Sequence, residues 1–168
     1  ASGTGNMKFA LNGALTIGTL DGANVEILEH VGRDNIFIFG LTADEVEARR
    51  REGYNAAATI DAQPDLKGVL DALSSGVFSP DDHGRFRPIV DALYHGDWFM
   101  VAADFNAYTK AQRGVDLLWH RTKDSTEKAI LNTVNMGWFS SHRTIPDYSR
   151  DLWNVPTALG EGPYVRTQ

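Results

Sequence analysis

The chain has 168 residues, the size of one ordinary domain, and its 42% hydrophobic and 23% charged residues match a globular protein with a core. A formal net charge of −6 argues against broad electrostatic attraction to nucleic acid or anionic membranes. The absence of cysteine excludes disulfides, thiolate metal sites and cysteine nucleophiles. With no signal peptide and no apolar run long enough to cross a bilayer, we expect a cytoplasmic protein without nucleic-acid or membrane partners.

The first third of the sequence alternates between helix and strand signals. Helical patterns surround Lys8 and cover 22–31 and 43–52, whereas apolar runs at 14–19 and 36–39 predict strands. Asp21 is the expected N-cap of the second helix, and Thr42 with Glu45 forms a capping box for the third. This alternation predicts a parallel α/β sheet.

Beyond residue 53 the patterns are mostly helical. We expect a short strand over 100–102 and helices at 65–73, at 88–94, after a cap at Asp104, from about 124, and over 144–153 with Pro146 in its first turn. Two or three strands are too few for a self-standing doubly wound domain. The chain also starts inside its own glycine-rich motif, so we expect the C-terminal piece of a larger protein.

The first eight residues, Ala1 to Lys8, form that motif: a Ser-Gly-Thr-Gly turn leads into a helix that carries a lysine one turn later. Glycines let backbone N–H groups approach an anion, and a helix N-terminus favours phosphate. The spacing fits neither a Walker A loop nor a dinucleotide fingerprint. Lys8 can reach the same ligand as a charge or as a covalent amine; a flexible terminus with a solvated lysine is the competing interpretation of this motif alone.

Over a longer stretch the sequence resembles the α-glucan (glycogen/starch) phosphorylases. The similarity is densest over 1–26, 104–119 and 129–153, and the blocks follow the family's order. The resemblance implies that Lys8 forms a Schiff base with pyridoxal 5′-phosphate.

The same resemblance assigns the residues before Lys8. It implies that Thr4 and Gly5 offer backbone N–H groups to the cofactor phosphate, and that Ser2 and Gly3 contact hydroxyls of the glucosyl unit. No residue of this chain is assigned as the catalytic acid or as a metal ligand.

The reaction implied is phosphorolysis of terminal α-1,4-glucosidic bonds of glycogen, starch or maltodextrin, which releases glucose 1-phosphate with retention. The implied fold is a two-domain glycosyltransferase architecture (GT-B type) with Rossmann-like halves, and the intact enzyme is expected to be a homodimer. Residues 1–140 would belong to the cofactor-binding half, and residues 141–168 would form a helix and tail crossing towards the missing N-terminal domain. The isolated chain is therefore expected to be inactive.

Two departures from the family pattern stand out. The glutamate that normally precedes Ala1 is absent, which leaves the sugar site incomplete, and His142 replaces an aspartate after the paired serines. We interpret His142 as an exposed residue flanking a helix. A nucleotide-sugar glycosyltransferase of the same architecture, or a noncatalytic fragment or interaction module, are the alternative functions.

Two groups of polar residues have the composition of metal ligands. They are Asp21, Asn24 and Glu26, and the loop residues 81–83. A helix cap at Asp21 and an acidic surface loop are the favoured interpretations, and no metal site is expected.

Overall fold

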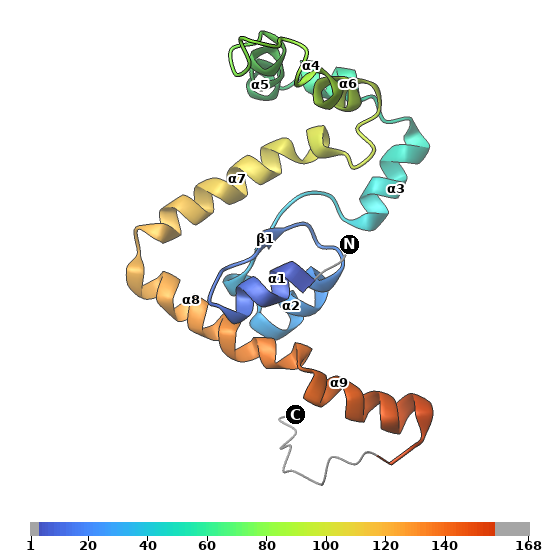
Figure 1. The fold of residues 1–168 in the computed structure, drawn as a ribbon, viewed down its shortest axis with the longest axis vertical. Coiled ribbons are helices and arrows are strands. Elements are labelled where there is room, and N and C mark those ends of the chain that lie inside the picture. The colour runs from blue at the N-terminus through green and yellow to red at the C-terminus, as the bar shows by residue number, and fades with distance from the viewer. Residues whose placement is uncertain (1–3, 157–168) are drawn as a thin grey trace.

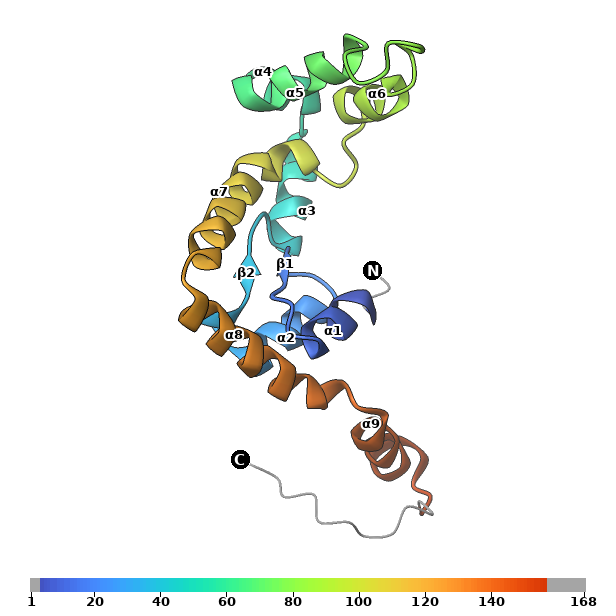
Figure 2. The same cartoon turned by 60° about the vertical axis from the view of Figure 1, so that its left-hand side comes forward.

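A computed structural model describes residues 4–156, and Figures 1 and 2 show their arrangement. The elements in chain order are α1 (Thr4–Leu11), β1 (Ile17–Gly18), α2 (Ala23–Val31), η1 (Arg33–Asn35), β2 (Phe37–Ile38), α3 (Ala43–Glu52), α4 (Ala56–Asp61), α5 (Pro64–Ser74), α6 (Arg87–His95), α7 (Val101–Trp119), α8 (Thr122–Asn135), η2 (Met136–Phe139), α9 (Ser141–Tyr148) and η3 (Ser149–Trp153). None of the helices described within this range is long and apolar enough to span a bilayer.

The two strands pair in parallel, which confirms the predicted orientation. Ile17 lies opposite Phe37 and Gly18 opposite Ile38, and the N–H of Phe39 donates to the carbonyl of Gly18 (3.1 Å). Both strands are shorter than the apolar runs that predicted them, because only these two residue pairs are in register on the ladder. In Figure 2, α7 lies on one side of this sheet and α1 and α2 lie on the other.

One buried cluster joins the elements around the sheet. It consists of Ala10, Ile27, Val31, Ile36 and Met136, all 5% exposed or less. These residues come from α1, α2, the residue before β2, and η2, so the cluster fixes both N-terminal helices against the sheet and against the end of α8. Burying apolar side chains is the dominant favourable contribution to such packing.

A second buried cluster is formed by residues of α4, α5, α6 and the start of α7. Helices α4, α5 and α6 form the top end of the molecule in Figure 1. The cluster consists of Ile60, Leu66, Leu70, Val90 and Ala102. Ala102 belongs to the first turn of α7, whose later part packs near β2, where Gly114 approaches the Phe37 ring. The long α7 helix therefore connects the helical end to the sheet.

Asp97 organises the turn that leads into α7. Its carboxylate accepts the N–H groups of Val101 (2.8 Å) and Ala102 (3.0 Å), and it accepts the hydroxyl of Tyr54 (2.6 Å). Asp97 and Met100 both adopt positive φ, at 35° and 54°, which is unusual outside glycine. The prediction of a strand over 100–102 is wrong, because α7 begins at Val101. The Asp97 carboxylate accepts two of the first N–H groups of this helix, which have no acceptor within the helix.

Asp104 does not cap α7, contrary to the sequence expectation. It lies within the first turn of the helix, and its Oδ1 accepts the N–H of Leu41 (2.9 Å). A Cβ on Gly40, where φ is +78°, would lie 2.5 Å from the Asp104 carboxylate. Asp104 therefore ties α7 to the segment after β2.

Of the two helix caps predicted in the N-terminal part of the chain, the structure confirms one. The predicted capping box of α3 is confirmed, since Thr42 and Glu45 exchange hydrogen bonds between side chain and backbone. The predicted Asp21 cap is wrong: Gly22 is the N-cap of α2, and the Asp21 carboxylate accepts the N–H of Gly22 (2.7 Å). The geometry of Gly22, with φ at 53°, turns the chain without a side-chain cap.

The last helix begins three residues earlier than expected. Ser140 is its N-cap, and the Ser140 hydroxyl accepts the N–H of His142 (3.2 Å). Pro146 consequently lies inside α9 rather than in its first turn. The helix then continues as the π-helical segment η3.

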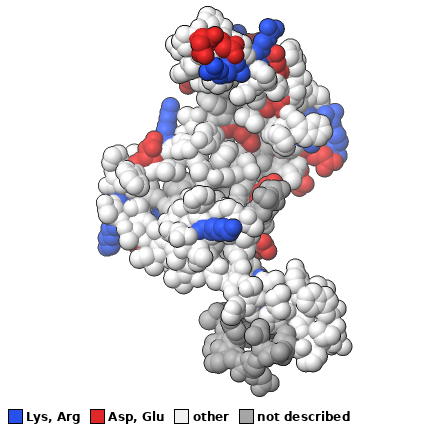
Figure 3. Space-filling view, in the orientation of Figure 1, with Lys and Arg blue, Asp and Glu red and all other residues white. Residues whose placement is uncertain are grey.

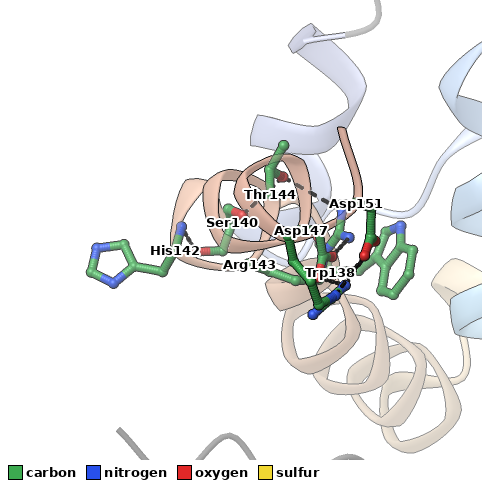
Figure 4. Close-up of polar contacts among 8 residues, drawn as sticks. Trp138, Ser140, His142, Arg143, Thr144, Asp147 and Asp151 are labelled. Carbon is green, nitrogen blue, oxygen red and sulfur yellow. Dashed lines mark hydrogen bonds and ion pairs between the residues drawn. The ribbon is translucent and has the colours of Figure 1, made fainter. Parts of the chain in front are cut away.

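Figure 4 shows how α9 is attached to η2. The Arg143 guanidinium donates to the Trp138 carbonyl (2.5 Å), stacks over the Trp138 ring at 3.8 Å and pairs with Asp147 (2.8 Å). The exposed His142 side chain points away from this group, in agreement with its interpretation as a flanking residue.

Tyr54 gives the fold a testable response to alkali. Burial, followed by the hydrogen bond to Asp97, raises the pKa of the Tyr54 hydroxyl from 10.0 to about 12. Because the neutral phenol is favoured in the folded state, its stabilisation is complete below the ordinary pKa and is lost as the pH rises towards the raised one. We expect the free energy of unfolding, measured by urea denaturation, to fall across this alkaline range.

Tyr54→Phe removes one hydrogen bond and should cost about 1 kcal/mol at neutral pH. It should also flatten the alkaline decrease in the free energy of unfolding. An alkaline decrease of unchanged size in Tyr54→Phe would contradict this assignment.

Candidate cofactor site

Helix α1 presents Thr4 and Lys8 on one exposed side. Both side chains are exposed, whereas Ala10 is fully buried in the cluster beside α2. Residues four apart lie one above the other on a helix, so Thr4 and Lys8 share a face. Ser2 and Gly3, the predicted sugar-contacting residues, lie outside the described residues.

The N-terminus of α1 has the properties of an anion-binding site. The first-turn N–H groups, including those of Thr4 and Gly5, have no acceptor within the helix, and the dipole favours negative charge there. No acidic residue lies in this first turn, so no carboxylate of α1 competes for the position. A Cβ on Gly5 would meet nothing within 4 Å, which leaves open space beside the backbone.

Lys8 completes a donor set that fits a phosphorylated aldehyde. Within residues 4–156, no hydrogen bond or ion pair engages the Lys8 ammonium group. Its backbone carbonyl accepts the Asn12 side-chain amide (2.8 Å), which closes the C-terminal end of the helix. Backbone N–H groups for a phosphate and an exposed amine one turn away therefore lie on the same short helix.

A hydrogen-bonded relay fixes the first turn of α1 to the end of β1. The amide nitrogen of Asn6 donates to Oδ1 of Asn24 (2.8 Å), and the amide nitrogen of Asn24 donates to the carbonyl of Thr19 (2.9 Å). Oδ1 of Asn6 in turn accepts the N–H of Met7 (2.9 Å). Every polar atom of the two asparagine side chains is thus used.

A cleft of about 870 Å³ opens at the carboxyl ends of the two strands. Thr19 and Asp21 after β1, and Phe39 and Leu41 after β2, line it together with residues of α3 and α7. This is the edge of a parallel sheet where ligands of α/β proteins bind. Among its lining residues none comes from α1, but Thr19 belongs both to the cleft and to the relay.

Charged side chains are unevenly distributed over the surface. Figure 3 shows few charges on the face over α1 and α2, whereas both signs gather over the α4–α6 end. In the cleft, burial raises the pKa of the Asp104 carboxyl above its ordinary value.

The structure does not assemble the candidate metal ligands. Asn24 is committed to the relay and Asp21 to the N–H of Gly22. In the acidic loop, Asp81 pairs with Arg85 (2.7 Å). Across the described part of the chain, no three histidine or acidic side chains come close enough to hold a metal ion.

The sequence interpretation missed Asn6 and Gly18, and it considered Asn24 only as a possible metal ligand. A Cβ on Gly18 would lie 2.5 Å from the Asn24 amide nitrogen, so the strand must carry glycine where α2 packs against it. Asparagine early in a helix was the available signal, because its amide competes with backbone hydrogen bonds. Its partner across eighteen residues could be found only from the fold.

Comparison with known proteins assigns the glycine-rich turn and its lysine to a family. The family model described as carbohydrate phosphorylase matches residues 1–155. The chain belongs to the carbohydrate phosphorylase family. The match includes the whole of α1 and the relay, so the phosphate-favouring helix lies within the phosphorylase sequence pattern.

Curated phosphorylases are similar over nearly all of this chain. The brain form of glycogen phosphorylase from Homo sapiens is 54% identical over 155 residues, which are 92% of this chain and 18% of that protein. Glycogen phosphorylases from Haemophilus influenzae (50% identical) and Chlamydia pneumoniae (51% identical) are each matched over 96% of this chain and 20% of their own length. The chain therefore spans about a fifth of the length of these relatives.

Gly18→Ala tests the close packing of the relay in this phosphorylase chain. The new methyl group must displace the Asn24 amide or the strand, and we expect the free energy of unfolding to fall by about 1–3 kcal/mol. Gly68→Ala is the matched control, because Gly68 lies inside α5 with open space where a Cβ would go.

The control substitution should raise the free energy of unfolding by about 0.5–1 kcal/mol, since alanine is the better helix former. Chemical denaturation of both variants measures the difference. Equal effects of the two substitutions would show that Gly18 is not needed for close approach.

Proposed function

We propose that this chain supplies the cofactor-binding segment of an α-glucan phosphorylase. The reaction is phosphorolysis of terminal α-1,4-glucosidic bonds of glycogen, starch or maltodextrin, with release of glucose 1-phosphate and retention at the anomeric carbon. The cofactor is pyridoxal 5′-phosphate. The observation that carries the proposal is an exposed Lys8 one turn after an acid-free helix N-terminus, within a chain of the phosphorylase family.

The roles of the residues follow from their chemistry. Lys8 is the anchor, because a primary amine can attach covalently to the aldehyde carbon of the cofactor. The N–H groups of Thr4 and Gly5 orient and hold the cofactor phosphate at the start of α1. When bound, pyridoxal phosphate supplies a phosphate group that acts beside the substrate phosphate as a proton relay or electrostatic partner.

The proposal includes the rest of the enzyme. Ser2 and Gly3 would contact the glucosyl unit through their backbone, and the groups that neutralise the substrate phosphate would come from other parts of a longer polypeptide. Residues 1–140 would complete a Rossmann-like half, and residues 141–168 would reach the other domain of the GT-B architecture. The short parallel sheet and the length of the relatives support this arrangement. The intact enzyme would be a homodimer.

Lys8→Ala in the full-length polypeptide that carries this chain tests the anchor. We expect the protein to lose stoichiometric pyridoxal phosphate, measured by its ultraviolet–visible absorbance after gel filtration, and to lose phosphorolysis with it. Lys110→Ala, an exposed lysine on α7, is the matched control and should keep both cofactor and activity.

Three results would contradict the proposal. Stoichiometric cofactor in Lys8→Ala would exclude Lys8 as its anchor. A wild-type protein that never shows the absorbance of a lysine-bound cofactor, and that transfers sugar from a nucleotide donor, would favour the nucleotide-sugar glycosyltransferase instead. Glucan phosphorolysis by the isolated 168-residue chain would contradict the need for a longer polypeptide.

A further inference from the structure

We propose that Asn24 is a positioning residue for the cofactor helix, and that it acts through Asn6. This inference rests on the proposed function, since it assumes that the start of α1 holds the cofactor phosphate. Asn24 would set the place of the first-turn N–H groups relative to the carboxyl end of β1. It would not touch the cofactor itself.

The direction of the relay allows only one orientation of each side chain. The Thr19 carbonyl can only accept, so Asn24 must turn its NH₂ group towards it and its Oδ1 towards Asn6. Asn6 must then donate to Asn24, which leaves Oδ1 of Asn6 for the N–H of Met7. A reversed amide at either position would bring two acceptors or two donors together. The relay therefore specifies a single arrangement of the first turn of α1.

The two ends of α1 are held by different means. Near its C-terminal end, Ala10 is fully buried and its carbonyl accepts the Thr133 hydroxyl (3.4 Å). Within residues 4–156, the bond between Asn6 and Asn24 is the one side-chain hydrogen bond from the first turn to another element. The part of the helix that would face the cofactor phosphate thus depends on Asn24 for its position.

Asn24 is itself held firmly against the strand. Its amide nitrogen would lie 2.5 Å from a Cβ on Gly18, so it packs directly on the β1 backbone. It also lies in the first turn of α2, whose Ile27 is fully buried one turn later. A rigid support of this kind is needed where binding groups must keep their geometry to a fraction of an ångström.

Asn24→Asp in the full-length holoenzyme is the primary test. Aspartate has the same shape but presents an oxygen to the Thr19 carbonyl, so the donor is lost and repulsion replaces it. We expect pyridoxal phosphate to dissociate about ten-fold faster than from the wild type, because one well-placed hydrogen bond contributes roughly that factor. The near-ultraviolet circular dichroism of the bound cofactor should change while Lys8 remains attached to it.

Asn135→Asp is the matched control. Asn135 also donates its amide to a backbone carbonyl, that of Leu131 (2.8 Å), but this bond is exposed and lies at the end of α8 within a single helix. The control should release the cofactor at the wild-type rate. An equal acceleration in both variants would overturn the proposal, because it would reflect general destabilisation.

A double-mutant cycle with Asn6→Ala and Asn24→Ala separates positioning from stability. If Asn24 acts through Asn6, the double variant should release the cofactor no faster than the faster single variant. If the two side chains had independent structural roles, the acceleration of cofactor release in the double variant would be the product of those in the single variants. Multiplied effects would overturn the proposal.

The outcomes for the two proposals can be distinguished. Cofactor retained in Lys8→Ala would exclude Lys8 as the anchor in the proposed function. If Lys8→Ala loses the cofactor but Asn24→Asp releases it at the wild-type rate, only the positioning role of Asn24 would be excluded.

Discussion

The close approach of α2 to the carboxyl end of β1 is the contact on which the candidate site depends. Gly18 leaves room for the Asn24 amide, which bonds both to the end of the strand and to the first turn of α1. The start of a helix is thereby held beside the edge of a parallel sheet, where fixed backbone dipoles favour an anionic ligand. The buried cluster around Ala10 and Ile27 makes this arrangement rigid.

Helix α7 and the segment after β2 complete the carboxyl edge of the sheet. Helix α7 joins the helical end to the sheet, and its first turn is held by the buried Asp97 with the Tyr54 hydroxyl. In the same turn, Asp104 fixes α7 to the segment after β2 and lines the cleft. Two carboxylates that accept backbone N–H groups therefore fix the start of α7, and one of them, Asp104, also lines the cleft.

Several local features could be predicted because their causes lie within a few residues. The α3 capping box needs only Thr42 and Glu45 three residues apart, and Gly32 ends α2 with the positive φ that glycine permits. The Asp21 and Asp104 caps were wrong for a shared reason. An acidic residue near a helix start has several possible N–H partners. Asp21 bonds the N–H of the adjacent Gly22, whereas Asp104 bonds that of Leu41, which tertiary packing brings beside α7.

The sequence by itself determined the family motif, the parallel strand–helix alternation and the place of Lys8 one turn into its helix, because these depend on residue identity and short-range spacing. Only the tertiary structure decided how the motif is held. Asn6 and Asn24 meet across eighteen residues, and Gly18 matters because another helix packs on it. Such contacts form because the buried cluster packs segments that are far apart in the sequence against each other. No pattern within a few residues can predict them.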